Sequence, residues 1–468
     1  MHQRPTGEPE GDRTVPDTSG SDRGAYDRAV ADELSNGAVP SAPGRSGTVS
    51  ERFDPRHNSL GFLRMVFALM VLVDHAFPLG GFHRGTDPMW DWTNGQESLG
   101  GLAVIGFFVV SGYLVTKSFM DSKTGTRYLW KRVLRIFPGF WVCLLVTVVV
   151  FAPIAYFYEF SSLHGYFSGA PDSPGNYLKN NALLSMNQYN INGLLSSTPY
   201  AHSGYPQAFD GSLWTLIYEF KCYIGVAILG TLGLLWRARV SVVLVMLVFW
   251  VAQIEDQLHP TRLAGWPLVG DPAMSRLAFI FLVGAIFYLY REKIPMSNVL
   301  AGVAFVVLVV GMRTALYTSI GEVAWAYLVL WLAVVLPLQH FDRYGDYSYG
   351  LYIYAFPVEQ LLALYGVQKL GFVPYVASAA AIALVFAAGS WFLVEKPFLR
   401  LKRLSLGEVP TRQVDGELVG LRRVWNPRWR KRGPGAPAPG SLQPVGGAAG
   451  ALQVAEGDER DRGTEPSS

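Results

Sequence analysis

LGFLRMVFALMVLVDHAFPLG, residues 60–80, is the stretch that decides the fold class. A membrane-crossing helix needs about 20 predominantly apolar residues, and this stretch supplies them. Its ionisable residues include Arg64 and His75, which are 11 positions apart. At about 100° per residue, 11 steps return to within about 20° of the starting face and advance about 16 Å. The stretch therefore predicts a membrane helix that carries a cation near one end and an imidazole near the other, on one face.

Other apolar runs follow along the chain, so the sequence predicts an all-α, polytopic membrane bundle of about ten transmembrane helices. The runs are long and do not alternate with period two, which disfavours a β-barrel. The ten predicted spans are residues 60–78, 99–119, 136–158, 213–235, 239–256, 274–291, 297–313, 321–338, 346–366 and 373–395.

Polar segments flank the apolar region. Residues 1–55 and 404–468 are rich in Gly, Pro and charged residues, so we expect mostly disordered tails on either side of a membrane domain over 56–403. With the N-terminus in the cytoplasm, the inner loops hold fifteen Lys and Arg residues and the outer loops hold six. The positive-inside rule then predicts that both termini are cytoplasmic and that the protein spans the cell membrane.

Composition excludes several classes of protein. Half of the 468 residues are hydrophobic and 16% are charged, which is unlike a disordered chain or a disulfide scaffold. A net charge of +3 does not favour nucleic-acid binding. Cys143 and Cys222 lie in apolar runs without a CxxC pair, and no metal site is predicted. The chain also lacks the GxSxG, P-loop and GxGxxG patterns.

Ionisable residues inside a membrane are costly, so they are functional candidates. Counting from the outer surface places Glu219, in SLWTLIYEFKCY, at about the depth of His75. Ser111, in GFFVVSGYLV, brings a hydroxyl to mid-membrane, and Arg132 and Arg135 belong to a basic inner rim. Each residue also has a purely structural interpretation: a histidine satisfied by a loop, a structural ion pair, helix packing, or positive-inside bias.

Together these segments resemble the acyltransferase-3 family of integral membrane acyltransferases. The similarity covers about residues 56–403. It rests on Arg64-x10-His75, GFFVVSGYL (106–114), KRVLRIFPGFW (131–141), SLWTLIYEF (212–220), DYSYGLYIYAFPVEQ (346–360) and VEKPF (394–398). The resemblance implies transfer of an acyl group from cytoplasmic acyl-CoA to a hydroxyl, with His75 as the catalytic histidine and Arg64 as its partner. The sequence departs from the family at Ala355, where members often carry histidine.

Chemistry agrees with this interpretation, because a hydroxyl that attacks a thioester needs a base of near-neutral pKa. We expect acyl-CoA, acetyl-CoA in particular, to be a co-substrate held by Arg64, Arg132, Arg135 and Ser111. His75 is the expected general base, and Glu219 either holds its tautomer or binds the acceptor. The expected acceptor is an extracytoplasmic glycan or a glycosylated small molecule, and a lipid-soluble small molecule such as a macrolide is an alternative. A covalent acyl-histidine intermediate, a polytopic transporter of a polar metabolite or glycan, and a membrane scaffold stay open as alternatives.

Overall fold

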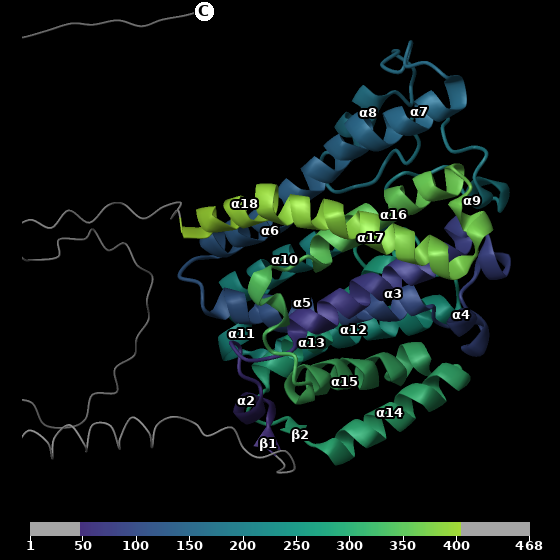
Figure 1. Ribbon diagram of the computed structural model, residues 1–468. Coiled ribbons are helices and arrows are strands. Elements are labelled where there is room, and N and C mark those ends of the chain that lie inside the picture. Colours follow the sequence, from purple (N-terminus) through teal and green to yellow (C-terminus); the bar gives the residue numbers. More distant parts are fainter. Residues whose placement is uncertain (1–46, 404–468) are drawn as a thin grey trace, which may run out of the picture. The chain divides into compact units, whose positions relative to one another are not determined.

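A computed structural model describes residues 47–403, and these form a bundle of helices that lie side by side (Figure 1). All ten predicted spans are helical. Their helices are α3 (Leu60–Gly80), α5 (Leu99–Met120), α6 (Gly125–Val146) with α7 (Ala152–Phe160), α10 (Thr215–Thr231), α12 (Arg239–Leu258), α13 (Pro272–Leu289), α14 (Asn298–Arg313), α15 (Glu322–Val335), α16 (Ser348–Leu364) and α17 (Phe372–Ser390) with α18 (Lys396–Arg400).

Short elements connect or extend these helices. Single turns η2 (Thr147–Phe151) and η7 (Trp391–Glu395) join α6 to α7 and α17 to α18, while η3 (Gly211–Trp214) precedes α10 and η4 (Tyr317–Gly321) precedes α15. The rest are β1 (Gly47–Thr48), α2 (Val49–Arg52), η1 (Phe82–Gly85), α4 (Pro88–Trp92), α8 (Pro174–Asn181), α9 (Pro199–His202), α11 (Leu234–Arg237), β2 (Pro295–Met296), η5 (Phe341–Tyr344), η6 (Val367–Leu370) and η8 (Leu401–Arg403).

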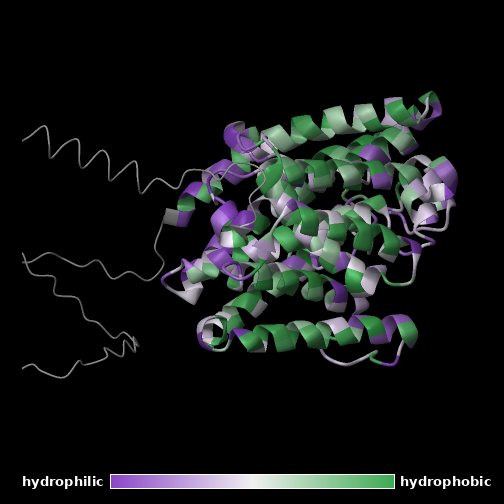
Figure 2. Ribbon diagram, turned by 90° about the horizontal axis from the view of Figure 1, so that it is seen from below, coloured by the Kyte–Doolittle hydropathy of each residue, from purple (hydrophilic) through white to green (hydrophobic). Residues whose placement is uncertain are grey.

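The predicted fold class, an all-α polytopic membrane bundle, is confirmed. Within residues 47–403, eight helices are long and apolar enough to cross a membrane. The remaining two predicted spans are the shorter helices α14, with 16 residues, and α16, with 17 residues. Apolar residues dominate the middle of the bundle, and hydrophilic residues gather towards its two ends (Figure 2).

The third span begins earlier than predicted. Helix α6 starts at Gly125 instead of residue 136, because the Thr124 side chain caps it by accepting a hydrogen bond from the backbone N–H of Arg127. Its first turns carry Lys131, Arg132 and Arg135. Hydropathy alone placed the start too late, because these basic turns lie outside the apolar part of a helix that nevertheless continues through them.

The predicted N-terminal tail, residues 1–55, also ends too late. Strand β1 pairs antiparallel with β2, and α2 follows it directly. Val49 and Phe53 are buried in the main hydrophobic core, which explains why this segment is ordered against the bundle. The other residues of the two predicted tails, 1–46 and 404–468, lie outside the described residues.

Helices α5 and α13 pack closely around two glycines. A Cβ atom at Gly112 would overlap the backbone oxygen of Phe281, and one at Gly284 would overlap that of Val109. Helix α3 packs against α5, α16 and α17. Because α3 is surrounded in this way, its polar face opens onto cavities inside the bundle. The end of the bundle where α3 begins is called the arginine end below, and the opposite end is called the histidine end.

Candidate functional site

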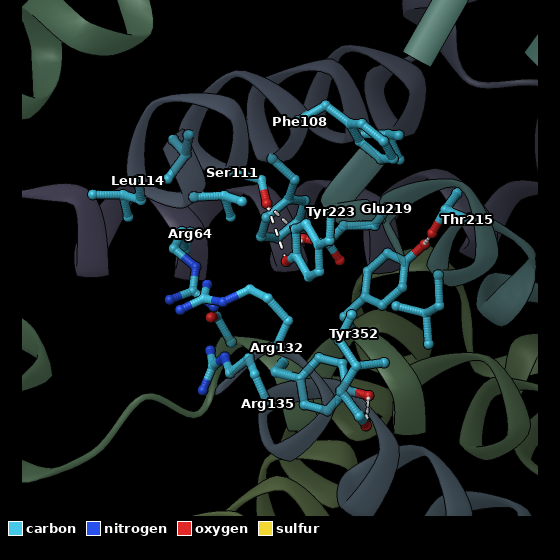
Figure 3. Close-up of a pocket in the computed structure, with 18 of the residues that line it drawn as sticks. Arg64, Phe108, Ser111, Leu114, Arg132, Arg135, Thr215, Glu219, Tyr223 and Tyr352 are labelled. Atoms are coloured by element: carbon cyan, nitrogen blue, oxygen red, sulfur yellow. Dashed lines mark hydrogen bonds between the residues drawn. The ribbon is translucent and has the colours of Figure 1, made fainter. Parts of the chain in front are cut away.

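Arg64 and His75 open into two different cavities. The arginine cavity, of about 230 Å³, lies between α3, α5, α6, α10 and α16 (Figure 3). Its apolar wall is Val104, Phe107, Phe108, Val110, Leu114, Val115, Ile136 and Leu216. Its polar lining is Arg64, Ser111, Arg132, Arg135, Thr215, Glu219, Tyr223, Ser348, Tyr349, Tyr352 and Lys402.

Two of the arginines that line the cavity are paired with a carboxylate. Asp346 accepts hydrogen bonds from Arg64 Nη1 at 2.5 Å and from Arg135 Nη2 at 2.7 Å, and it also accepts one from the Ser348 hydroxyl. Arg135 lies 3.7 Å from Glu395 as well. Burial raises the pKa of Asp346, but the charges of Arg64 and Arg135 outweigh burial and hold that pKa below its ordinary value. Asp346 therefore stays ionised and fixes both guanidinium groups.

Arg132 and Lys402 are the cations left for an incoming anion. Arg132 has no carboxylate partner among residues 47–403; it donates to the Ser118 hydroxyl at 3.2 Å and lies over the rings of Tyr128 and Tyr223. Burial and the nearby charges of Arg135 and Arg132 lower the pKa of Lys402 to about 8. The arginine cavity thus combines fixed cations with two uncommitted ones, an arrangement suited to phosphate groups.

Glu219 lies in the arginine cavity, not beside His75. Its Oε1 accepts hydrogen bonds from Ser111 at 2.7 Å and from Tyr223 at 2.5 Å. The expectation that Glu219 orients the imidazole is wrong in position, because the turn η3 precedes α10 and sets Glu219 deeper. Glu219 is eight positions after Gly211, about 14 Å along η3 and α10, whereas His75 is five positions before the end of α3, about 7.5 Å.

The histidine cavity, of about 490 Å³, lies at the other end of α3. Its polar lining is Asp74, His75, Gln96, Ser98, Ser212, Gln253, Asp256, Gln257, Arg276, Thr318 and Tyr352, and the remaining lining is Val71, Gly100, Gly101, Val104, Ile105, Trp214, Pro272, Ala273 and Leu277. The His75 ring meets Phe356 edge-on, with ring centroids 5.1 Å apart. Its Nδ1 is buried and has no hydrogen-bond partner within residues 47–403, so Nε2 is the nitrogen left to meet a ligand.

Two residues line both cavities, Val104 on α5 and Tyr352 on α16. The Tyr352 hydroxyl donates to the backbone oxygen of Ser212 at 2.7 Å and lies 2.5 Å from the Thr215 hydroxyl. These bonds tie α16 to the start of α10 and hold the tyrosine in place. The two cavities are therefore neighbours separated by one fixed aromatic wall.

The structure brings the predicted donor-side residues Arg64, Ser111, Arg132 and Arg135 to one cavity and places His75 in the adjoining one. Sequence reasoning missed Lys402 and Arg276. Arg276 was counted among the cations of the outer loops. It lies in the second turn of α13 and pairs with two buried carboxylates. The signal available was an arginine within the first turns of an apolar run, which is costly unless paired.

Comparison with known proteins places these cavities in a family. The family model described as an acyltransferase domain, acyltransferase 3, matches residues 57–394. The chain belongs to the acyltransferase-3 family. This acyltransferase is 32% identical over 361 residues to the O-acetyl transferase of Shigella phage Sf6, with 74% of this chain and 96% of the relative covered.

A second relative of this acyltransferase is Nodulation protein 10 of Rhizobium leguminosarum bv. viciae, which is 26% identical over 401 residues, with 76% of this chain and 97% of the relative covered. No solved structure matches the chain. The family and the O-acetyl transferase relative make the protein a multi-pass membrane O-acyltransferase. That activity is the one the sequence favoured over a transporter or scaffold.

Proposed function

We propose that this acyltransferase moves an acyl group, acetyl in the first instance, from acyl-CoA in the arginine cavity to a hydroxyl in the histidine cavity. The observation that carries the proposal is the pair of adjoining cavities, one cationic and one holding His75, with Tyr352 and Val104 between them. A donor and an acceptor that entered from opposite ends would meet at this wall.

The donor half rests on charge. Arg132 and Lys402 face the arginine cavity without carboxylate partners among residues 47–403, while Asp346 holds Arg64 and Arg135 in place. We assign the phosphates of coenzyme A to Arg132 and Lys402, with Arg64 and Arg135 as the fixed cations behind them. Arg64 and His75 are about 16 Å apart along α3, and a long, flexible pantetheine arm suits such a path. The arginine end is then the cytoplasmic end.

The chemical step needs one base and one leaving group. His75 Nε2 takes the proton of the acceptor hydroxyl as its oxygen attacks the thioester carbonyl carbon. The carbon–sulfur bond breaks, the thiolate of coenzyme A leaves, and the imidazolium returns its proton to that sulfur. Since Glu219 lies in the arginine cavity with Ser111 and Tyr223, we place it on the donor side and not as the partner of His75.

The acceptor half rests on the histidine cavity and on the relative named O-acetyl transferase. The Oε1 atom of Gln253, a residue that lines the cavity, has no partner among residues 47–403, and the exposed Trp214 lines the cavity as well. Amides and an aromatic ring suit a polyhydroxylated ligand. We propose an extracytoplasmic glycan or glycosylated small molecule as the acceptor.

The donor half is tested by calorimetric titration of the detergent-purified protein with acetyl-CoA. Arg132→Ala is expected to weaken binding about tenfold or more, since it removes a charged contact. Arg239→Ala is the matched control, because that arginine lies at the same end of the bundle and donates to Leu289 O outside the cavity. Absence of saturable binding to folded wild-type protein would contradict the donor assignment.

The base is tested with labelled acetyl-CoA and a panel of methyl glycosides. His75→Ala is expected to reduce transfer at least 100-fold while acetyl-CoA still binds, because a general base contributes about 10²–10⁴ to a rate. His83→Ala, in the exposed turn η1, is the control and is expected to retain transfer. Undiminished transfer in His75→Ala would refute the role of His75. A labelled protein adduct trapped at His75 would favour the covalent alternative.

A further inference from the structure

The wall of the histidine cavity opposite α3 is polar, although it is built from apolar helices. Gln253 and Gln257 come from α12, Arg276 from the second turn of α13, and Thr318 from η4. All four line the cavity that holds His75. Membrane helices seldom carry such groups without a partner or a function, so this wall calls for an explanation.

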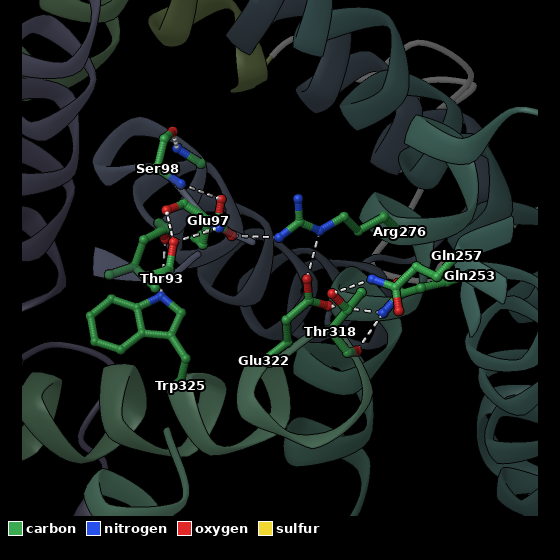
Figure 4. Close-up of polar contacts among 11 residues, drawn as sticks. Thr93, Glu97, Ser98, Gln253, Gln257, Arg276, Thr318, Glu322 and Trp325 are labelled. Carbon is green, nitrogen blue, oxygen red and sulfur yellow. Dashed lines mark hydrogen bonds and ion pairs between the residues drawn. The ribbon is translucent and has the colours of Figure 1, made fainter. Parts of the chain in front are cut away.

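Arg276 is held rigidly by two carboxylates (Figure 4). Its Nε donates to Glu322 Oε1 at 2.6 Å and its Nη2 donates to Glu97 Oε2. Both glutamates are buried, at 0% and 3% exposure, whereas the Arg276 side chain keeps 30%. The third nitrogen, Nη1, has no partner among residues 47–403. The ion pairs thus fix the guanidinium and leave its Nη1 amino group for the cavity.

The amide side chains are fixed in the same manner. Gln253 Nε2 donates to the backbone oxygen of Thr318 at 2.5 Å, and Gln257 Nε2 donates to the Thr318 hydroxyl at 2.6 Å. Gln253 is only 3% exposed, yet its Oε1 has no hydrogen-bond partner within residues 47–403. A buried polar atom normally finds a partner. Gln253 Oε1 is therefore an unpaired acceptor on a residue that lines the histidine cavity.

We propose that Arg276, Gln253 and Gln257 form the acceptor subsite of the histidine cavity, and that this subsite takes an uncharged sugar. Fixed donors and acceptors on one wall match the alternating hydroxyl groups of a sugar ring, and the cavity of about 490 Å³ falls in the usual range for small-ligand sites. This inference rests on the proposed function, because it supplies the acceptor that faces His75.

Charge decides between neutral and anionic sugars. The single cation of the wall is paired with Glu97 and Glu322, and the cavity lining adds the carboxylate of Asp256. A uronate or another acidic sugar would meet the Asp256 carboxylate in a site whose one arginine is already paired. Like charges in a partly dehydrated cavity repel strongly, so the subsite discriminates against acidic acceptors.

The test measures steady-state transfer of labelled acetyl from acetyl-CoA to matched methyl glucoside and methyl glucuronide. The wild type is expected to prefer the neutral glycoside about tenfold or more. Gln257→Ala is expected to raise the KM for the glycoside about fivefold while the KM for acetyl-CoA is unchanged, since one hydrogen bond is lost. Gln257 is exposed, so this variant keeps the fold, and Gln339→Ala, in the loop after α15, is the matched control.

Asp256→Asn is the second variant, and it is expected to reduce the preference for the neutral glycoside. If the wild type transfers acetyl but Gln257→Ala and Asp256→Asn leave the acceptor KM and the charge preference unchanged, the subsite is wrong and the proposed function stands. If the wild type binds acetyl-CoA but transfers acetyl to neither glycoside, the sugar acceptor of the proposed function is refuted. The proposed subsite is then refuted as well.

Discussion

Lys402 lies among other cations at the arginine end, and its charge depends on pH. Its pKa of about 8 is lower than that of an ordinary lysine, because burial and the charges of Arg135 and Arg132 disfavour the protonated form. Below pH 8 the side chain is charged and attracts an anion; above pH 8 the charge is progressively lost.

We therefore expect the affinity for acetyl-CoA to fall about tenfold between pH 7 and pH 9, as one charged contact is lost. Lys402→Arg keeps its charge over this range and is expected to remove most of the pH dependence. Calorimetric titration of both proteins across the range makes the comparison. Equal pH dependence in wild type and variant would assign the effect to another group.

Glu322 and Glu359 both have no exposed surface. Comparing them measures how much a charged partner contributes to the stability of the bundle. Glu322 is paired with Arg276, whereas neither carboxyl oxygen of Glu359 has a hydrogen-bond partner within residues 47–403. Glu322→Gln leaves Arg276 paired with Glu97 alone, so it should destabilise the protein by about 1.5–3 kcal/mol, the value of one hydrogen bond to a charged group.

Glu359→Gln replaces an unpartnered carboxyl by a neutral group of the same shape, so it should change stability by less than about 1 kcal/mol or increase it. Thermal unfolding in detergent compares the two variants. A larger loss of stability for Glu359→Gln than for Glu322→Gln would mean that Glu359 makes a stabilising contact of its own.

At the scale of elements, the contact between α5 and α13 sets how close the two cavities lie. Gly112 and Gly284 let the two backbones touch, as small residues do in membrane bundles. Val104 and Ser111, on α5, line the cavities from this helix. A shift of α5 would therefore move the shared wall and the donor side together.

Gly112→Ala is expected to destabilise the bundle by about 1–3 kcal/mol or more and to reduce transfer, because the new methyl group meets the Phe281 backbone. Gly302→Ala, on α14, is the matched control: a Cβ atom there meets nothing within 4 Å. Thermal unfolding and acetyl transfer are measured for both. Equal stability of the two variants would show that α5 and α13 tolerate separation.

At the scale of the whole molecule, the proposed reaction requires the arginine end to face the cytoplasm. The two native cysteines, Cys143 and Cys222, are buried, so single introduced cysteines can report sidedness. Ser203 lies exposed beyond α9 at the histidine end, and Lys293 lies exposed between α13 and α14 at the arginine end.

In intact cells, a membrane-impermeant maleimide is expected to label Ser203→Cys and to label Lys293→Cys only after lysis. The positive-inside rule gives the same orientation from loop charge. Labelling of Lys293→Cys in intact cells would show that the bundle has the opposite orientation. The cationic cavity would then face outward, away from cytoplasmic acyl-CoA.

Several features of the site were predictable because they depend on local spacing. The 11-residue interval between Arg64 and His75 places them on one face of any straight helix, and the motif around Ser111 brought that residue to the same cavity as Arg64. Glu219 was misplaced, because its depth depends on the turn η3 and not on hydropathy.

The sequence by itself determined the helical membrane bundle, the acyltransferase-3 resemblance and the polar face of α3, since hydropathy and helical periodicity are properties of single segments. Only the tertiary structure decided that Asp346 holds Arg64 and Arg135, that Glu97 and Glu322 hold Arg276, and that Tyr352 separates two cavities. These groups are far apart in the chain. Their meeting depends on the depth and register at which helices pack, and that register is a property of contacts between segments.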